Sequence, residues 1–437
     1  MTGLGRRHAA SSVARIAPLF GLPASLPGNA WASSSRDRVP GLDELLSPAG
    51  WPYASAAPVE PGDPGRFNAL FGRDAAITSL EVLPARPDVA RATLRGLAAL
   101  QGRRDDPETD EEPGKIVHEW WPRAPADLLR AGWPVRDGEL RYYGSADSTL
   151  WFLILLASLG DRALEAELKE ARRAAGGWLA RMLDRGGGLV RHGPRRGPGG
   201  LAQQGWRDAI DPADPSQHGG GILEAGGNAP RPPLADADTQ AVAVVALRAL
   251  AELSREERWA AEAARVATRV EEAFDPETIA LDGDCRKVRG AGSQLGWLLW
   301  ADALSPPARE RAVERLCRAD VFTPWGLRTL SSEHPQFGPE AYHRGAVWPF
   351  DSWLGWGGLR AVRPQAAERL RRGILDAIEA VGGAPELFAV GPEGPEAIPI
   401  ANRVQAWTVG ARWALENEWD ARSLSWPIAQ DAHHRSP

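Results

Sequence analysis

Six stretches of the chain are apolar almost throughout, and each opens on a small or polar residue. Examples are STLWFLILLASL after Asp147 and TQAVAVVALRAL after Asp238. A helix that is apolar on every face must be covered on every side, so these stretches predict helices inside a larger helical body. The six begin near Asp74, Asp147, Asp238, Ser293, Gly345 and Asn402.

Charged segments of a second kind lie between the apolar stretches. Their apolar residues recur with the 3.6-residue period of a helix that turns one face to water. Short segments at 41–46 and 124–131 are candidates for one more helix of this kind. The amphipathic segments run over 88–101, 162–183, 255–273, 306–318 and 364–381.

This alternation predicts an all-α fold of two concentric rings of helices, the (α/α)6 toroid or six-hairpin barrel. No β-branched runs precede the helices, which argues against a TIM barrel, and uneven spacing argues against a stacked solenoid. The long non-helical segments all follow an outer helix, so we expect them to gather on one face, where functional loops usually lie. These segments are 102–146, 184–235, 319–342 and 382–401.

Composition narrows the class of partner. The chain carries 51 basic and 57 acidic residues with no long run of either sign, which argues against nucleic acid or an anionic membrane surface. Its two cysteines have no metal-ligand spacing, so we expect no disulfide framework and no metal. The chain shows no Gly-rich phosphate cradle, and no organic cofactor is expected. No apolar run reaches the ~18–20 residues of a membrane span. The 19 tryptophans suggest ring-stacking surfaces in addition to core.

The first residues call for separate treatment: we expect 1–38 to be an extension and 39–437 to be a single catalytic domain. Arg6-Arg7 and the later Ala30-Trp31-Ala32 loosely imitate a twin-arginine export signal. Because Arg15 and several prolines interrupt the intervening apolar region, a disordered extension of a cytoplasmic protein is preferred, with export as the alternative.

The stretch QGWRDAID over Gln204–Asp211 has the composition of a loop, since Gly205 and the prolines that follow exclude a helix. Asp208 stands close to the indole of Trp206. An indole can stack on a pyranose ring, and an apolar wall raises the pKa of a nearby acid until it can protonate a leaving oxygen. The alternative is an aspartate that caps a turn beside a half-buried tryptophan.

Polar residues collect where the apolar helices begin. Phe71–Asp74, Tyr142–Asp147 and Asp238 are each either a helix cap or part of a polar rim. The run over Glu340–Asp351 contains more polar and aromatic groups than a cap requires, which favours a functional role. The segment 110–121 mixes charges with two tryptophans and is either a substrate lip or a polar loop pinned by aromatic rings.

Glu386 lies in PELF, within a glycine-rich loop before the last apolar helix. A glutamate between proline and two apolar residues is poorly explained as a solvated charge. Together with Asp208 it supplies two carboxyl groups from separate loops. Inverting glycoside hydrolysis requires such a pair, a protonated acid for the leaving group and an ionised base for water.

Taken in order, eight short runs resemble the catalytic domain of bacterial glycogen-debranching, or amylo-α-1,6-glucosidase-like, proteins of the (α/α)6 glycosidase group. The resemblance implies an inverting α-glucosidase-type hydrolase with Asp208 as general acid and Glu386 as general base. The runs are Phe71–Asp74, Asp110–Glu119, Tyr143–Asp147, Gln204–Asp208, Arg328–Glu333, Tyr342–Pro349, Pro385–Phe388 and Gln405–Trp407.

By the same resemblance, the terminal-sugar subsite would be lined by Arg73, Asp74, His343, Arg344, Trp348 and Gln405. The loops add further candidates for substrate contact: Phe71, His118, Glu119, Tyr143, Asp147, Gln204, Trp206, Arg207, Asp211, Asp238, Asp351 and Trp407.

Two departures from that family pattern affect the expected substrate. Only ~70 residues precede the first matching run, where many relatives carry a β-rich domain, which favours a small oligosaccharide or glycoside over a polysaccharide. Phe350-Asp351 stands where His-Asp usually follows Trp-Pro, which is expected to alter a subsite contact.

The expected function is therefore hydrolysis of an α-glucosidic bond, either an α-1,6 branch of glycogen or an oligosaccharide, or the bond of a small α-glucoside. One alternative is a catalytically inactive carbohydrate-binding protein, against which the acids at both positions speak. Another is a phosphorylase or a different sugar-active enzyme on the same toroid, against which Glu386 speaks. The linkage and the oligomeric state stay open.

Overall fold

The computed structural model describes residues 38–57, 66–194, 199–209 and 219–420. Contacts divide the chain into two units, Met1–Arg38 and Val39–Pro437, and the second contains every helix and strand described below. Residues 1–37, for which an extension or a signal-like segment is expected, lie outside the described residues.

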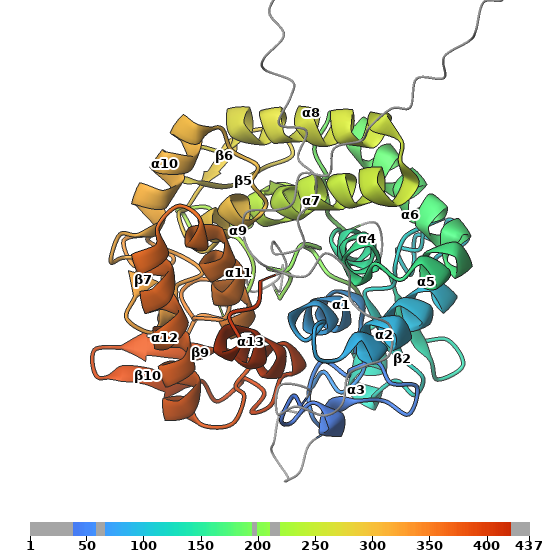
Figure 1. Ribbon diagram of the computed structural model, residues 1–437, viewed down its shortest axis with the longest axis horizontal. Coiled ribbons are helices and arrows are strands. Elements are labelled where there is room, and N and C mark those ends of the chain that lie inside the picture. The colour runs from blue at the N-terminus through green and yellow to red at the C-terminus, as the bar shows by residue number, and fades with distance from the viewer. Residues whose placement is uncertain (1–37, 58–65, 195–198, 210–218, 421–437) are drawn as a thin grey trace, which may run out of the picture. The chain divides into compact units, whose positions relative to one another are not determined.

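The apolar stretches form an inner ring of helices (Figure 1). Each helix packs against the next in the chain, and the last packs against the first, so the ring closes. The predicted all-α toroid is thereby confirmed. The ring consists of α1 (Gly72–Glu81), α4 (Ser148–Leu159), α7 (Ala237–Ser254), α9 (Gln294–Trp300), α11 (Pro349–Arg360) and α13 (Ala406–Glu416).

The amphipathic segments form outer helices, and each packs against an inner helix that precedes it. They are α2 (Pro87–Ala99), α6 (Lys169–Arg185), α8 (Glu257–Ala273), α10 (Pro306–Leu316) and α12 (Pro364–Val381). The segment expected at 162–183 is divided into α5 (Arg162–Glu167) and α6. Neither candidate for a sixth outer helix is long: the described chain has a single 3-10 turn at Asp43–Leu45 and the short α3 (Ala126–Arg130).

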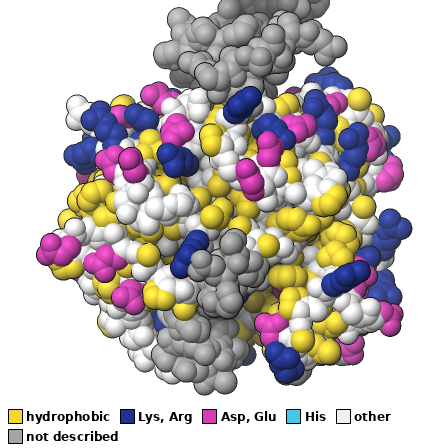
Figure 2. All heavy atoms as spheres, turned by 90° about the horizontal axis from the view of Figure 1, so that it is seen from below, with side chains coloured by type: hydrophobic (Ala, Val, Ile, Leu, Met, Phe, Trp, Pro, Cys, Tyr) yellow, Lys and Arg dark blue, Asp and Glu magenta, His cyan; other side chains and the backbone are white. Residues whose placement is uncertain are grey.

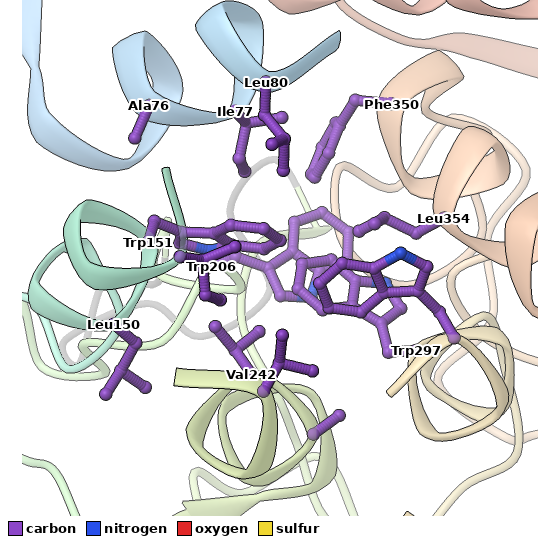
Figure 3. Packing of buried hydrophobic residues seen from close by; sticks show 14 of the residues in the cluster. Ala76, Ile77, Leu80, Leu150, Trp151, Trp206, Val242, Trp297, Phe350 and Leu354 are labelled. Atoms are coloured by element: carbon purple, nitrogen blue, oxygen red, sulfur yellow. The ribbon is translucent and has the colours of Figure 1, made fainter. Parts of the chain in front are cut away.

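Burial follows the sequence pattern. In α8 the buried residues are Trp259, Ala263, Val266 and Val270, spaced by four, three and four, as expected for one face of a helix. Helix α4 is buried along nearly its whole length. Inside the ring, side chains from several inner helices meet around three tryptophans, Trp151, Trp206 and Trp297 (Figure 3).

The long connections contain short antiparallel strands that the sequence did not predict. In the first sheet, β2 lies between β1 and β3 and pairs Phe71 with Glu119 and Glu119 with Tyr142. Runs of two to four residues are too short to show the alternation that identifies a strand. The sheets comprise β1 (Leu70–Phe71), β2 (Glu119–Trp121) and β3 (Leu140–Tyr142); β4 (Ala235–Asp236), β5 (Thr278–Leu281) and β6 (Lys287–Arg289); β7 (Phe322–Thr323) and β8 (Gly326–Leu327); β9 (Phe388–Gly391) and β10 (Gly394–Ala397).

The surface matches the balanced composition. On the face seen in Figure 2, basic and acidic side chains are intermixed, and neither sign gathers into a large patch. Among the described residues, no helix is both long and apolar enough to cross a membrane.

Candidate active site

Asp74, Asp147 and Asp238, the acids predicted at the starts of inner helices, do not cap them with their side chains. Phe71 occupies the N-cap position of α1, so Asp74 lies within the first turn. Asp147 is the N-cap residue of α4, but its side chain makes no capping bond. Asp236 caps α7, which places Asp238 inside that helix. The capping alternative is therefore wrong for Asp74, Asp147 and Asp238, whose carboxyl groups are used elsewhere.

Three carboxyl groups, from Asp74, Asp147 and Asp208, lie around the guanidinium of Arg73. Arg73 Nη1 lies 3.0 Å from Asp208 Oδ2 and 3.7 Å from Asp147 Oδ2. Its Nε lies 3.3 Å from Asp74 Oδ1. The guanidinium also lies 5.9 Å from the ring centroid of Trp407. We call Arg73, Asp74, Asp147 and Asp208 the Arg73 cluster.

Burial sets the protonation of this cluster. It raises the pKa of Asp208 to about 6, although the positive charge of Arg73 acts in the opposite direction. It likewise raises the pKa of Asp74 to about 6, and it raises the pKa of Asp147. Because one cation faces three buried acids, Asp208 takes up a proton at a higher pH than an exposed aspartate does, and it can carry that proton in mildly acidic solution.

Arg207, the neighbour of Asp208, is bound from four directions. It donates to Asp238 Oδ2 at 3.0 Å, to Ser293 Oγ at 3.0 Å, and to the backbone oxygens of Thr329 at 2.9 Å and His343 at 3.2 Å. Arg207 and Asp238 are 2% and 0% exposed. Burial and these bonds indicate that the two residues support the loop from within, and their expected contact with the substrate stays a prediction.

Trp206 is also a supporting residue. Its side chain is 1% exposed, and its ring stacks on Trp297 with centroids 5.7 Å apart (Figure 3). Rings of Trp348 and Phe350 meet it at steep angles. With Trp297 stacked on the ring and the Arg207 guanidinium 4.5 Å from its centroid, this packing favours a core role over the stacking on a sugar expected from the sequence.

Asp351 lies deeper in the same core. It is fully buried, and Trp297 donates its indole N–H to Asp351 Oδ1 at 2.5 Å. Burial raises the pKa of Asp351 to about 7. The side chain thus helps to hold the tryptophan core together, and its expected contact with substrate stays a prediction.

Glu386 is held by donors on both of its oxygens. The Tyr342 hydroxyl donates to Oε1, while the backbone and side-chain nitrogens of Asn402 donate to Oε2 at 2.9 and 3.1 Å. The Asn402 amide also donates to Gln405 Oε1 at 3.0 Å. Burial raises the pKa of Glu386 to about 7, although these donors act in the opposite direction. Three donors and no acceptor suit an ionised carboxylate.

The surroundings of Asp208 and Glu386 overlap. The pKa of Tyr342, which donates to Glu386, is raised well above its ordinary value by burial and by the charge of Glu386, with a further contribution from Asp208. The charge of Asp74 acts in turn on Glu386. Asp208 and Glu386 thus belong to one electrostatic site, although they lie in different connections between helices.

Rings and a neutral histidine complete this side of the site. His343 stacks on Trp348 with centroids 5.4 Å apart, and its Nδ1 accepts from the backbone of Gly221 at 3.1 Å. Burial lowers the pKa of His343 far below its ordinary value, so the ring is neutral and its proton lies on Nε2. Trp348 donates to the backbone oxygen of Tyr342 at 2.8 Å.

Glu119, the first residue of β2, and His118 just before it interact electrostatically with the Arg73 cluster. Glu119 accepts from the indole of Trp121 at 2.7 Å, and burial raises its pKa to about 7, with the charges of Asp208 and Asp74 adding to the effect. Burial and the charge of Arg73 lower the pKa of His118.

The remaining expected residues have the following contacts. Tyr143 donates its hydroxyl to Leu100 O at 2.8 Å and lines a separate surface cavity of about 610 Å³ that no member of the Arg73 cluster lines. This position favours a structural role for Tyr143 over the expected contact with substrate. Gln204 is buried and donates to Asp110 Oδ2 at 2.9 Å. Phe71 packs edge-on against His118, Arg344 is buried, and Asp211 lies outside the described residues.

Four residues of this region were missed by sequence reasoning: Tyr342, Asn402, His192 and Asp236. Tyr342 lies within a run that was identified, but nothing distinguished it from its neighbours. Asp236 is separated by one residue from Asp238, and such a pair of acids at a helix start is a usable signal. Among the described residues, no group of three or more His, Cys, Asp or Glu is arranged to hold a metal ion.

Residues 156–389, more than half of the chain, match the family described as the mannosylglycerate hydrolase MGH1-like glycoside hydrolase domain. The chain belongs to this family. It is thus a glycoside hydrolase, as the sequence resemblance implied, but the narrower likeness to glycogen-debranching proteins has no support from this match. A comparison with curated proteins finds no match.

Solved structures agree with the observed fold. One is the GH63 mannosylglycerate hydrolase from Thermus thermophilus in complex with Tris and D-glycerate, with a TM-score of 0.63, 16% identity, and coverage of 86% of this chain and 98% of that chain. The same enzyme in complex with glucose gives a TM-score of 0.62 at 16% identity, with coverage of 89% and 100%. At this identity the likeness shows the fold alone.

Proposed function

We propose that this family member hydrolyses the α-glycosidic bond of a small glycoside with inversion at the anomeric carbon. Asp208 is the general acid and Glu386 is the general base. The observation that carries the proposal is the difference between two buried carboxyl groups in one electrostatic site. Asp208 shares a cation with two further acids, whereas Glu386 receives three hydrogen bonds and donates none.

The chemistry assigned to each residue follows from these contacts. Asp208 gives its proton to the glycosidic oxygen as the bond to the anomeric carbon breaks. Glu386 takes a proton from a water molecule, whose oxygen attacks that carbon from the opposite side. The products are a free sugar of inverted configuration and the protonated leaving alcohol. Arg73 and Asp74 are suited to hydrogen-bond the hydroxyl groups of the sugar.

The two pKa values predict the pH dependence. Turnover requires Asp208 protonated, with a pKa of about 6, and Glu386 ionised, with a pKa of about 7. The base therefore has the higher value, and the productive form is a minority, about 6% of the enzyme at pH ~6.5 for independent groups. The profile of kcat/KM is a bell with limbs near these two values.

For the substrate we propose a small α-hexoside. The sequence resemblance favours an α-glucoside, and the solved enzyme of the same fold that is named a mannosylglycerate hydrolase favours an α-mannoside of a small acid. Both have a hexose on one side of the bond and a leaving group on the other. Arg73 and Asp74 would bind hydroxyl groups of either sugar, so the choice between an α-glucoside and an α-mannoside depends on residues outside the Arg73 cluster.

The test is sugar release by the purified protein from isomaltose, panose, maltotriose, trehalose, glucosylglycerate, mannosylglycerate and glycogen. Asp208→Asn and Glu386→Gln serve as variants that keep the shape of each side chain. We expect release from one small substrate and its loss in both variants. Release that survives either substitution would show that the roles are misassigned, and sugar binding without release from any substrate would indicate an inactive binding protein.

A further inference from the structure

A buried histidine and aspartate lie behind the general acid. His192 Nε2 is 2.6 Å from Asp236 Oδ2, and both residues are less than 5% exposed. Two backbone hydrogen bonds of 2.8 and 2.7 Å join His192 to Leu234, the residue before β4, and so hold the backbone of His192 in place. The mechanism above uses neither side chain.

The contacts of the imidazole determine where its proton lies. The backbone N–H of Gln204 donates to His192 Nδ1 at 3.0 Å. An amide N–H can only donate, so Nδ1 carries no proton, and Nε2 carries one and donates to Asp236. Asp236 Oδ1 accepts from the backbone of Thr239 at 2.8 Å in the first turn of α7. Burial alone would raise the pKa of Asp236, but the bond from His192 holds it below its ordinary value.

We call Gln204–Asp208 the acid loop. The bonds from Asp236 through His192 end at Gln204, the first residue of this loop. Gln204 O accepts from the backbone of Ala146 at 2.7 Å, and Gly205 O accepts from Arg73 at 3.3 Å. Asp208 Oδ2 meets the same Arg73 nitrogen at 3.0 Å. The hydrogen bond to His192 thus fixes a residue only four positions before the acid.

Close packing gives independent evidence of the same arrangement. A Cβ atom on Gly205 would lie 2.9 Å from Asp236 Oδ2 and 3.1 Å from Thr239 Oγ1. The backbone of the acid loop therefore rests directly on the carboxylate to which His192 donates. A displacement of about 1 Å in a catalytic group costs on the order of 100-fold in rate, so this seat matters for catalysis.

We propose that His192 and Asp236 are positioning residues that set the place of Asp208 by holding the acid loop at Gln204 and Gly205. The proposal rests on the role of Asp208 as general acid. Neither residue touches the substrate: their effect reaches the reaction through the loop.

Two substitutions of His192 separate its two hydrogen bonds. In His192→Asn the side-chain oxygen takes the place of Nδ1 and still accepts from Gln204. In His192→Gln the side-chain amide takes the place of Nε2 and keeps the contact with Asp236, but the acceptor for Gln204 is lost. Asp236→Asn is a second route to the same loss, because an amide that donates to Nε2 moves the imidazole proton to Nδ1, where it opposes the Gln204 N–H.

The readout compares two substrates: the O-glycoside that the wild-type enzyme hydrolyses and the glycosyl fluoride of the same sugar, whose leaving fluoride needs no proton from Asp208. We expect His192→Gln and Asp236→Asn to lower kcat on the O-glycoside by about 10- to 100-fold and on the fluoride by less than about threefold. His192→Asn should retain most of both activities. Thermal unfolding of each variant confirms that it is folded.

Equal losses on both substrates would overturn the proposal, because they would show a general structural role. Unchanged turnover of the O-glycoside by folded His192→Gln would overturn it too. If the wild-type enzyme hydrolyses neither substrate, the proposed function fails and this inference fails with it, an outcome recognised without any variant.

Discussion

The hydroxyl of Tyr342 donates to Glu386 Oε1 and stabilises its ionised form. We predict that Tyr342→Phe raises the pKa of Glu386 above its value of about 7. A hydrogen bond to a charged group contributes about 1.5–3 kcal/mol, and one pH unit corresponds to ~1.4 kcal/mol, so the rise is about one to two pH units. Asn402 still donates twice to the other oxygen, so the carboxylate keeps its place.

The sign of the effect on activity follows from the order of the two pKa values. Ionised Glu386 and protonated Asp208 must coexist, so a higher pKa of Glu386 moves the alkaline limb of the kcat/KM profile upward by about one to two pH units. The productive fraction at the maximum falls by about 10- to 100-fold. The acidic limb, set by Asp208, stays near 6.

The assay is the kcat/KM profile of wild-type enzyme and Tyr342→Phe between about pH 4 and 10. Tyr143→Phe is the matched control, since it removes a hydroxyl that donates to Leu100 O outside the site, and we expect it to leave the profile unchanged. A shift confined to the acidic limb would show that Glu386 has the lower pKa of the two. An unchanged profile would refute the role given to the tyrosine.

Two further predictions concern stability. Glu81 is fully buried, its two carboxyl oxygens have no hydrogen-bond partner among the described residues, and burial raises its pKa well above the usual value. The folded state therefore retains a proton that the unfolded state loses above pH ~4.3, so the free energy of unfolding falls as pH rises. Glu81→Gln should flatten this decline, measured by urea unfolding between about pH 5 and 9. Trp206→Phe should lower the free energy of unfolding by about 1–3 kcal/mol through lost core volume while KM changes less than about twofold, whereas a large rise in KM without loss of stability would restore the sugar-stacking role.

The ring of helices was predictable because burial leaves a direct trace in the sequence. A run such as STLWFLILLASL, which forms α4, has no polar face and must lie inside. Helix starts were less predictable where polar residues have other tasks. Helix α11 begins at Pro349, after the Gly345 that the pattern indicated, because Val347 is extended and pairs with Arg328 and Phe388.

The sequence predicted which residues form the candidate site better than it predicted what each residue does there. Asp208 and Glu386 stood out because each acid lies beside apolar residues in a loop. Which acids share Arg73 depends on which connections meet. Strand pairs two or three residues long join the segments before Arg73 and Asp147, and a backbone bond from Ala146 to Gln204 holds the loop of Asp208 beside them. The sequence also could not show whether Trp206 turns its ring to solvent or to Trp297, since an indole is suited to both.

The central claim is inverting hydrolysis by Asp208 and Glu386, and proton NMR of the first sugar released tests it most directly. Hydrolysis of the preferred α-glycoside is followed within the first minutes, before the anomers equilibrate. We predict that the β-anomer appears first and that Asp208→Asn and Glu386→Gln release neither anomer at a measurable rate. An α-anomer appearing first would show retention of configuration and would contradict the account.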